Sequence, residues 1–540
     1  MYYHIRVRLF APKRRKYAFN AHIEIACANF SRNCVSKFLV CMPQTKTLRH
    51  GGEFMQIGFN NEQYLKMQSE HIMERIKKFD NKLYLEFGGK LFDDYHASRV
   101  LPGFAADSKL QMLMQVADQA EIIMVVSAED IERNKVRADL GLTYDKDVIR
   151  LIEEFRSRGL YVGSVVLSMY ANQHSATIFQ ARLEKMGIKV YHHYMIPGYP
   201  TNIPFIVSEN GFGKNDYIET TRPLVVVTAP GPGSGKMSTC LSQLYHEHER
   251  GIRAGYAKFE TFPIWNLPLY HPVNLAYEAA TADLNDINMI DPYHLKAYGV
   301  TTVNYNRDVE IFPVLNAIFM KIYGSSPYAS PTDMGVNMAG NCIFDDIACR
   351  KASYQEIIRR YYHTLAGVAD SSHTKEELNK IKLIMSQVNL SPEDRPCVNP
   401  ALERAAQTGN PAVAIELTDG TMITGKTGDL LGASAAALMN SLKYLAGIKK
   451  EVKVLSPESL APIQMLKTTY LGSKNPRLHT DEMLIALSAN AAVNEDAALV
   501  LGHLSKLKGS QVHSSVILSQ ADRKIFKTLF CDVTYEAKSI

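Results

Sequence analysis

Apolar and polar positions follow two kinds of pattern between residues 62 and 262. Short, nearly continuous apolar runs are typical of strands buried in a parallel sheet, whereas apolar residues three and four positions apart indicate amphipathic helices. The apolar runs predict strands over residues 82–87, 121–128, 161–170, 189–196, 223–229 and 253–262. The segments between them predict helices over residues 62–79, 145–160, 174–188 and 236–251. Because strands that alternate with helices form right-handed crossovers, we expect a mostly parallel sheet with helices on both faces.

The pattern changes beyond about residue 325. Consecutive helical segments without strands lead to a Pro-rich break at residues 391–400. After this break, "AVAIELTDGTMITGK" predicts a hairpin turned by Asp419-Gly420, and the chain closes with a strand–helix–strand unit. The predicted organisation is an α/β domain with a P-loop-like turn over residues 55–325, a helical segment over 326–408 and a smaller C-terminal α/β domain over 409–540.

The first 54 residues differ from the rest of the chain. They hold ten Lys/Arg but only two acids, Glu24 and Glu53, and they show no clear helical or strand period. Gly51-Gly52-Glu53 can be encoded by GGAGGAGAA, a purine-rich sequence typical of a ribosome-binding site, just upstream of Met55. We expect residues 1–54 to be a non-native or disordered extension, with Met55 as the true start. A genuine basic tail is the alternative, because such tails are common.

Charge and cysteine usage narrow the class of protein. Residues 55–540 hold 50 Lys/Arg against 53 Asp/Glu, which gives no support for nucleic-acid binding. No run of about 18 uninterrupted apolar residues occurs, which argues against a membrane span. The eight Cys form no CxxC pair and are typical of reduced thiols, so we expect a cytoplasmic protein. A homo-oligomer is the base-rate expectation.

The stretch "PLVVVTAPGPGSGKMSTC" (residues 223–240) is a near match to the phosphate-binding pattern GxxxxGK[ST]. Pro230 stands where the first Gly of that pattern belongs, and Met237 stands where the Ser or Thr belongs. An apolar strand precedes the loop and a helix follows it, as the pattern requires. The residues that we expect to bind a ligand are Gly231, Gly233, Ser234, Gly235, Lys236 and Ser238.

The chemistry of this loop favours an anion. Its glycines permit positive φ and close approach to the backbone, and the helix N-terminus supplies N–H groups and positive potential. Because a methionine cannot coordinate Mg²⁺, ordinary Mg-ATP hydrolysis is doubtful. The alternative is a strand–helix turn that merely needs glycine.

A second dense polar stretch is "EFGGKLFDDYHASRVLPG" (residues 86–103). It follows a predicted strand and should therefore lie at the carboxyl edge of the sheet, where open α/β sheets bind ligands. Lys and Arg suit an anionic substrate, whereas Asp and His suit proton transfer. The candidate catalytic residues are Lys90, Asp93, Asp94, His96 and Arg99. The alternative is a solvated loop with internal salt bridges.

Two later stretches, "VNYNRDVEIFPVL" and "SPTDMGVN", have the polar, turn-rich character of site loops. Their candidate residues are Arg307, Asp308, Thr332, Asp333 and Asn337. The acids Asp283, Asp286 and Asp291 are more typical of helix caps and loops than of a metal site, and we predict no metal site.

Several long segments resemble a known family. These are "EFGGKLFDDYHASRVLPGF", "ETTRPLVVVTAPGPGSGKMSTCLSQLYHE", "TFPIWNLPLYHPVNLAYEAATADLND" and "SPTDMGVNMAG". They resemble the uncharacterised bacterial family called domain of unknown function 1846, also known as uncharacterised protein family 0371, from about Met55 to the C-terminus. The resemblance implies a large α/β part, a helical insert and a smaller C-terminal α/β part. It implies neither an activity nor any site residue.

These patterns predict a protein that binds a nucleotide or other phosphorylated metabolite at a degenerate glycine-rich loop. Phosphoryl transfer is the first reaction class to test. One alternative is a non-catalytic regulatory or scaffold protein. The other is an enzyme that acts on a phosphorylated metabolite without hydrolysing ATP, which Met237 favours over a standard NTPase.

Overall fold

The computed structural model describes residues 57–88, 91–92, 94–137 and 140–537. The predicted N-terminal extension lies outside the described residues, as do the candidate residues Lys90 and Asp93.

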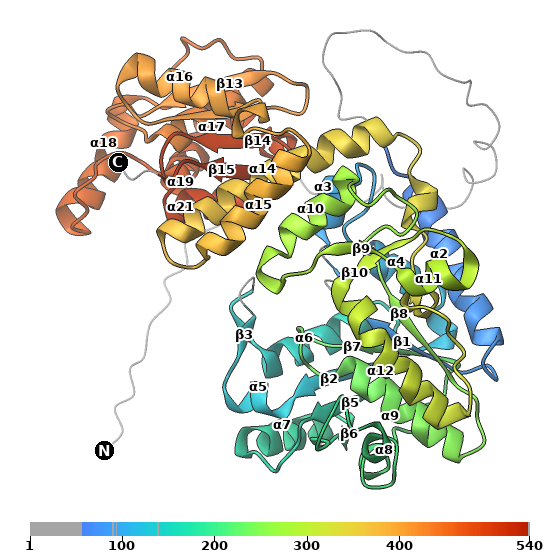
Figure 1. Cartoon of the computed structure of the whole chain (residues 1–540). Coiled ribbons are helices and arrows are strands. Elements are labelled where there is room, and N and C mark those ends of the chain that lie inside the picture. The colour runs from blue at the N-terminus through green and yellow to red at the C-terminus, as the bar shows by residue number, and fades with distance from the viewer. Residues whose placement is uncertain (1–56, 89–90, 93, 138–139, 538–540) are drawn as a thin grey trace, which may run out of the picture. The chain divides into compact units, whose positions relative to one another are not determined.

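The larger of the two main sheets has seven strands, and every neighbouring pair in it is parallel (Figure 1). The strand order is β11-β8-β1-β7-β2-β5-β6. The strands are β1 (Leu83–Phe87), β2 (Ala120–Ser127), β5 (Tyr161–Ser168), β6 (Lys189–His192), β7 (Leu224–Thr228), β8 (Gly255–Phe259) and β11 (Gly335–Val336). The first six lie within one residue of, or inside, the predicted apolar runs, and β2 and β7 are buried along their whole length. The predicted α/β class is confirmed.

Helices cover this sheet. The right-handed crossover rule puts α6 (Tyr144–Ser157) and α7 (His174–Lys185) on one face, and α9 (Lys236–Glu249) and α12 (Asn306–Tyr323) on the other. The observed packing agrees, because α6 contacts β2 and β5 whereas α9 contacts β1, β7, β8 and α12. The start of α9 thus lies over the centre of the sheet, at the carboxyl end of β7.

One predicted site loop is a helix. The stretch that begins at residue 303 forms the short strand β10 (Val303–Tyr305) and then α12. Val309, Phe312 and Leu315 are buried at helical spacing, and this apolar stripe outweighs Pro313, which lies inside the helix. The second predicted loop also differs from expectation, because it contains the short helix α13 (Pro331–Met334) and the edge strand β11.

The strand order reverses direction beside β7. After β7 the chain crosses through α9 to β8, on the far side of β1, whereas after β2 it crosses through α6 to β5 in the opposite direction. β7 and β2 are neighbours, so a crevice is expected between their carboxyl ends. The glycine-rich turn that follows β7 lies at this position.

The C-terminal part has a separate four-stranded sheet with the order β13-β12-β14-β15. Its strands are β12 (Ala412–Glu416), β13 (Met422–Lys426), β14 (Gln511–Ser514) and β15 (Asp532–Tyr535). β12 and β13 form the predicted hairpin, whose turn includes Gly420 at φ 81°. β14, α21 (Gln520–Thr528) and β15 form the closing strand–helix–strand unit. A second hydrophobic core, distinct from that of the large sheet, supports this part.

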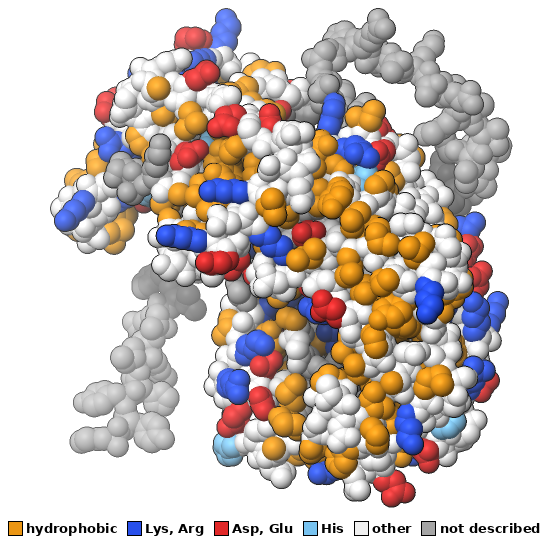
Figure 2. Space-filling view, viewed as in Figure 1, with side chains coloured by type: hydrophobic (Ala, Val, Ile, Leu, Met, Phe, Trp, Pro, Cys, Tyr) orange, Lys and Arg blue, Asp and Glu red, His pale blue; other side chains and the backbone are white. Residues whose placement is uncertain are grey.

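Surface composition agrees with the charge count of the sequence. Figure 2 shows acidic and basic side chains interspersed on the face that it draws, without a continuous patch of one sign. Among the described residues, no helix combines the length and the apolar character that a membrane span needs.

Candidate functional site

The glycine loop (residues 229–235) connects β7 to α9, and side chains hold its carbonyl groups. The Ser168 hydroxyl donates to the Ser234 carbonyl at 2.6 Å, and the Ser234 hydroxyl donates to the Gly231 carbonyl at 2.7 Å. Gly233 and Gly235 have φ of 73° and 89°, which only glycine adopts readily. Gly231 is needed for a different reason, since a Cβ there would lie 2.2 Å from the Tyr144 hydroxyl.

The amides of the same segment are left unpaired. The N–H groups of Gly231 and of residues 233–238 donate no hydrogen bond to any described residue, and Thr239 is the first to donate within the helix, to Gly235. Successive amides of this kind, with the carbonyls turned away, form a concave anion-binding arrangement. The positive end of the 14-residue helix α9 adds to the potential at the same place.

Lys236 and Ser238 project from the first turn of α9. Both side chains are partly exposed, and Lys236 forms no ion pair or hydrogen bond with the described part of the chain. An unpaired cation beside unpaired amides can hold a phosphate group without first breaking an internal contact. Ser238 is one position past the residue that binds Mg²⁺ in the standard pattern, and Met237 occupies that position.

Four ionisable side chains gather near the carboxyl ends of β1 and β8. We call Glu86, Lys258, Glu260 and Asp308 the carboxyl-edge cluster. The Lys258 ammonium lies 2.7 Å from Glu260 Oε1 and 2.5 Å from Asp308 Oδ2. Glu86 is the register partner of Lys258 on the neighbouring strand, and its Oε2 accepts a hydrogen bond from the Tyr256 hydroxyl at 2.7 Å. Two carboxyl groups thus contact the ammonium group, and Glu86 lies close enough to act on the pKa of Lys258.

The protonation of this cluster is poised near neutral pH. Burial raises the pKa of Glu260 to about 7; Asp308 adds to the shift and Lys258 opposes it. Burial also acts to raise the pKa of Asp308, but Lys258 holds it below its usual value. The pKa values of the two carboxyl groups are thus shifted in opposite directions, a pattern that general acid–base chemistry uses. Nearby, the indole Nε1 of Trp265 is buried without a hydrogen-bond partner in the described residues.

The glycine loop and the carboxyl-edge cluster belong to one region of the sheet. In the register of the sheet, Val227 pairs with Glu86 and Glu86 pairs with Lys258, which puts the Lys258 Cα about 10 Å from that of Val227. Residues of both the cluster and the loop affect the pKa of the Tyr199 hydroxyl. Burial raises its pKa to about 12, Glu86 adds to the shift and Ser238 opposes it. A ligand on the loop would therefore lie in the same region of the sheet as the titratable groups of the cluster.

The described residues of the second predicted site are engaged in internal contacts. Asp94 caps α3 (Tyr95–Val100) and pairs with Lys109 at 2.8 Å. His96 and Arg99 both contact Glu356, at 3.3 and 2.8 Å. His96 Nε2 is buried without a partner among the described residues, and its ring lies edge-on to Tyr277. The catalytic assignment of these residues stays a prediction, and Lys90 and Asp93 lie outside the described part of the chain.

The weaker candidate residues from the sequence fall into two groups: residues that form structural contacts, and one residue that belongs to the carboxyl-edge cluster. Asp291 caps α11 (Pro292–Tyr298) and accepts a hydrogen bond from the Thr332 hydroxyl. Asp286 pairs with Arg307 at 3.3 Å. Asp308 alone joins the carboxyl-edge cluster. Among the described residues, no three His, Cys, Asp or Glu side chains are arranged to hold a metal ion.

Two surface hollows lie elsewhere. One, of about 650 Å³, is lined by α2 (Asn61–Lys77) and the residues just before β2. The other, of about 380 Å³, is lined by α17 (Ala433–Leu445) and the segment that follows it. Neither includes the glycine loop, whose tip at Pro232 and Gly233 is exposed. A ligand at the loop would therefore be open to solvent on one side.

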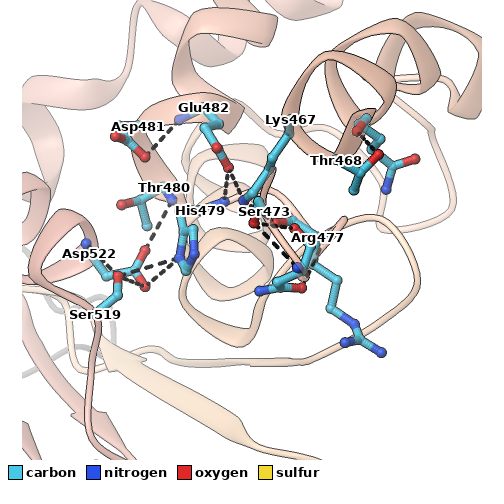
Figure 3. Close-up of polar contacts among 12 residues, drawn as sticks. Lys467, Thr468, Ser473, Arg477, His479, Thr480, Asp481, Glu482, Ser519 and Asp522 are labelled. Atoms are coloured by element: carbon cyan, nitrogen blue, oxygen red, sulfur yellow. Dashed lines mark hydrogen bonds and ion pairs between the residues drawn. The ribbon is translucent and has the colours of Figure 1, made fainter. Parts of the chain in front are cut away.

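A further polar group, the cap cluster, joins two helices of the C-terminal part (Figure 3). It consists of His479, Ser519 and Asp522, at the starts of α19 (Thr480–Asn490) and α21. Ser519 donates its hydroxyl proton to Asp522 at 2.7 Å, and the same carboxylate accepts from the Thr480 amide at 3.0 Å. Both Ser519 and Asp522 contact the same nitrogen of His479, Nδ1. A nucleophilic triad needs them on opposite nitrogens, so this cluster serves as a helix cap.

Sequence reasoning missed three members of the carboxyl-edge cluster: Glu86, Lys258 and Glu260. Each was read as part of a predicted strand or its flank. The available signal was their charge, because "KLYLEF" and "RAGYAKFETF" are otherwise mainly apolar. A buried charge in such a strand requires a partner, and Glu86 lies about 170 residues from its register partner Lys258 in the chain.

Comparisons with known proteins agree with the resemblance seen in the sequence. A family model described as "Domain of unknown function DUF1846, N-terminal" matches residues 57–389, and the corresponding C-terminal model matches residues 393–539. A UPF0371 protein from Streptococcus thermophilus is 55% identical over 478 residues, which cover 88% of this chain and 97% of the relative. A UPF0371 protein from Corynebacterium urealyticum is 57% identical over 483 residues, which cover 89% and 97%. These descriptions name no activity.

Proposed function

The chain belongs to the DUF1846 family, and we propose that it binds a nucleotide or other phosphorylated small molecule at the glycine loop. The observation that carries this proposal is the run of unpaired amides at Gly231 and residues 233–238, beside the unpaired Lys236. A phosphate group supplies the negative charge and the acceptor oxygens that these donors lack.

The carboxyl-edge cluster favours an enzyme over a scaffold. Glu260 has a pKa of about 7 because it is buried, and Lys258 and Asp308 hold it in place. Such a group can accept or donate a proton near neutral pH, and carboxyl groups with pKa values shifted by burial and a charged partner are concentrated at functional sites. We therefore place Glu260 as the proton-transfer group in a reaction of the bound phosphorylated ligand.

The reaction class depends on Mg²⁺. Phosphoryl transfer from ATP needs an oxygen ligand for the metal near the loop, and Met237 stands at the usual position of that ligand. This substitution favours an enzyme that acts on a phosphorylated metabolite without hydrolysing ATP. Phosphate release from ATP, measured with and without Mg²⁺, separates the two: robust Mg-dependent release assigns phosphoryl transfer instead.

Ligand-induced stabilisation tests the binding site. ATP, ADP and a panel of sugar phosphates are added separately to the full chain, and the thermal midpoint is recorded. A ligand that binds only the folded state raises the midpoint by mass action. We expect at least one ligand to raise it, and the shift should disappear in Lys236→Ala.

The control for that experiment is Lys185→Ala. Lys185 is an exposed residue of α7 and forms no ion pair or hydrogen bond with the described part of the chain. The control should keep the full shift. If Lys236→Ala keeps it as well, the glycine loop is not the binding site. If no ligand stabilises the wild-type protein, the regulatory or scaffold alternative takes its place.

A further inference from the structure

A second positively charged group surrounds Glu356 of α14 (Asp346–Ala369). The Glu356 side chain is fully buried and accepts hydrogen bonds from three guanidinium groups. Arg359 binds it through both Nε and Nη2 at 2.6 Å, Arg360 through Nε at 2.9 Å, and Arg99 of α3 through Nε at 2.8 Å. We call Arg99, Arg359 and Arg360 the arginine cluster.

Positive charge is in excess here. Among the described residues, the three arginines face two carboxylates, Glu356 and Asp532, and the latter lies 3.8 Å from Arg99 Nη1. Burial lowers the pKa of Arg360 to about 10; Glu356 opposes this shift, whereas Arg359 and Arg99 add to it. Burial also lowers the pKa of His96, which therefore tends to be neutral at Glu356. The local charge thus exceeds what the neighbouring acids compensate.

The outer edges of the arginines have unused donors. Nη1 and Nη2 of Arg360, Nη2 of Arg99 and Nη1 of Arg359 donate to no described residue. None of these nitrogens is among the buried atoms that lack a partner, so each reaches solvent. The three side chains are 17–25% exposed. Their Nε atoms are fixed on the buried carboxylate, while terminal nitrogens remain available from the outside.

We propose that the arginine cluster binds an oxyanion, a phosphate or carboxylate group of a small molecule. Guanidinium groups match the geometry of such groups through paired N–H donors, and they keep their charge when partly buried. Glu356 is the positioning residue, because it holds all three side chains in one orientation before the ligand arrives. The bound anion also neutralises the excess charge. This inference does not depend on the glycine loop.

The competing account is that the arginines only tie α3 to α14. The two accounts differ in what an added anion does, so binding of simple anions distinguishes them.

The test is isothermal titration at low ionic strength on the full chain carrying Lys236→Ala, which removes the principal cation of the glycine loop. Inorganic phosphate, pyrophosphate and succinate are titrated separately. We expect binding by the phosphate compounds, by succinate, or by both, and the pattern identifies the group that the site prefers. The substitution Arg360→Met, introduced into the Lys236→Ala chain, should weaken anion binding at least tenfold.

The matched control is Arg350→Met on the same helix. Arg350 pairs with Asp346 on the surface, away from Glu356, so its loss should leave anion binding unchanged. Arg99→Met is the second test variant, because it removes a guanidinium from the opposite side while Arg359 and Arg360 still satisfy Glu356. Circular dichroism checks that each variant is folded. The proposal is overturned if no anion binds, or if both test variants bind like Arg350→Met.

Discussion

The glycine loop and the cap cluster are both polar groups at helix N-termini, yet they differ in how their donors are used. At the cap cluster, Asp522 accepts from the Thr480 amide and from the Ser519 hydroxyl (Figure 3). At the glycine loop, no described residue accepts from the amides around Lys236. The comparison separates a helix N-terminus whose donors are satisfied within the chain from one whose donors no described residue satisfies.

Electrostatics explains the difference. The starts of α19 and α21 come together, so their positive ends would repel each other without an intervening anion. Asp522 supplies that anion from within the chain, and hydrogen bonds hold the pKa of its carboxyl below the usual value although burial acts to raise it. No described carboxylate caps the start of α9. We infer that a ligand phosphate takes the same place there.

The largest expected effect is on stability, at the cap cluster. Asp522→Ala removes the acceptor of the Thr480 amide and leaves buried donors unpaired, which should lower the free energy of unfolding by about 2–4 kcal/mol. Urea unfolding followed by circular dichroism measures this loss. Phosphate-ligand binding at the glycine loop should be unchanged.

The control is Asp522→Asn, which keeps an acceptor oxygen for the Thr480 amide and should lose less stability. If Asp522→Ala leaves stability intact but reduces ligand binding, the cap cluster is a functional site and the comparison fails.

A second prediction concerns pH. Burial raises the folded-state pKa of Glu260 from its ordinary value of 4.5 to about 7. Its stabilising contribution is therefore complete below about pH 4.5 and is lost as the pH rises through about 7. The Glu260→Gln variant has no charge to bury at this position, so its free energy of unfolding should not fall in this way. Between pH 5 and pH 8, the difference in free energy of unfolding should shift in favour of the variant by about 2–3 kcal/mol.

Trp265 makes this ionisation observable. It is the only tryptophan of the chain. Trp265 and Glu260 are neighbours because both side chains approach Gly335. A Cβ placed on Gly335 would lie 2.4 Å from the indole and 3.4 Å from Glu260 Oε2. Wild-type fluorescence should change with a midpoint near pH 7, and Glu260→Gln should abolish that step. A step that persists in the variant would assign the titration to another group.

The smallest expected effect is at the N-cap of α21. Ser519→Ala removes the hydroxyl that accepts from the Asp522 amide at 3.1 Å, which should cost about 1 kcal/mol. Thr528→Ala, at the other end of the helix, removes a hydroxyl bonded only to the Lys524 carbonyl and should cost less. Urea midpoints of the two variants provide the measurement. Equal midpoints would contradict the capping role of Ser519.

Local sequence patterns were enough for the strands and for the glycine loop. The apolar run Leu224–Thr228 predicted a buried strand, and the glycines before Lys236 predicted the turn into a helix, as the structure shows. Both signals lie within a few neighbouring residues. The same reasoning misread α12, because the polar residues of its first turn and Pro313 hid the apolar stripe of the helix.

The remaining site groups depend on contacts between distant segments. The sequence could not show that Arg99 and His96 contact Glu356, because Glu356 lies about 260 residues further along the chain. Lys258 and Glu260 looked like ordinary strand residues because Asp308 approaches them from α12. No local pattern encodes these pairings, so their protonation could not be predicted from the sequence.

The most direct test of the central claim compares two glycines at opposite ends of α9. Gly235 and Gly251 have φ of 89° and 76°, so alanine costs about 1–2 kcal/mol of backbone strain at either position. Binding of a stabilising phosphate ligand is measured by isothermal titration in Gly235→Ala and Gly251→Ala. We predict that Gly251→Ala binds like the wild type and that Gly235→Ala binds at least tenfold more weakly. Equal binding by the two variants would contradict the claim that the glycine loop holds the phosphate.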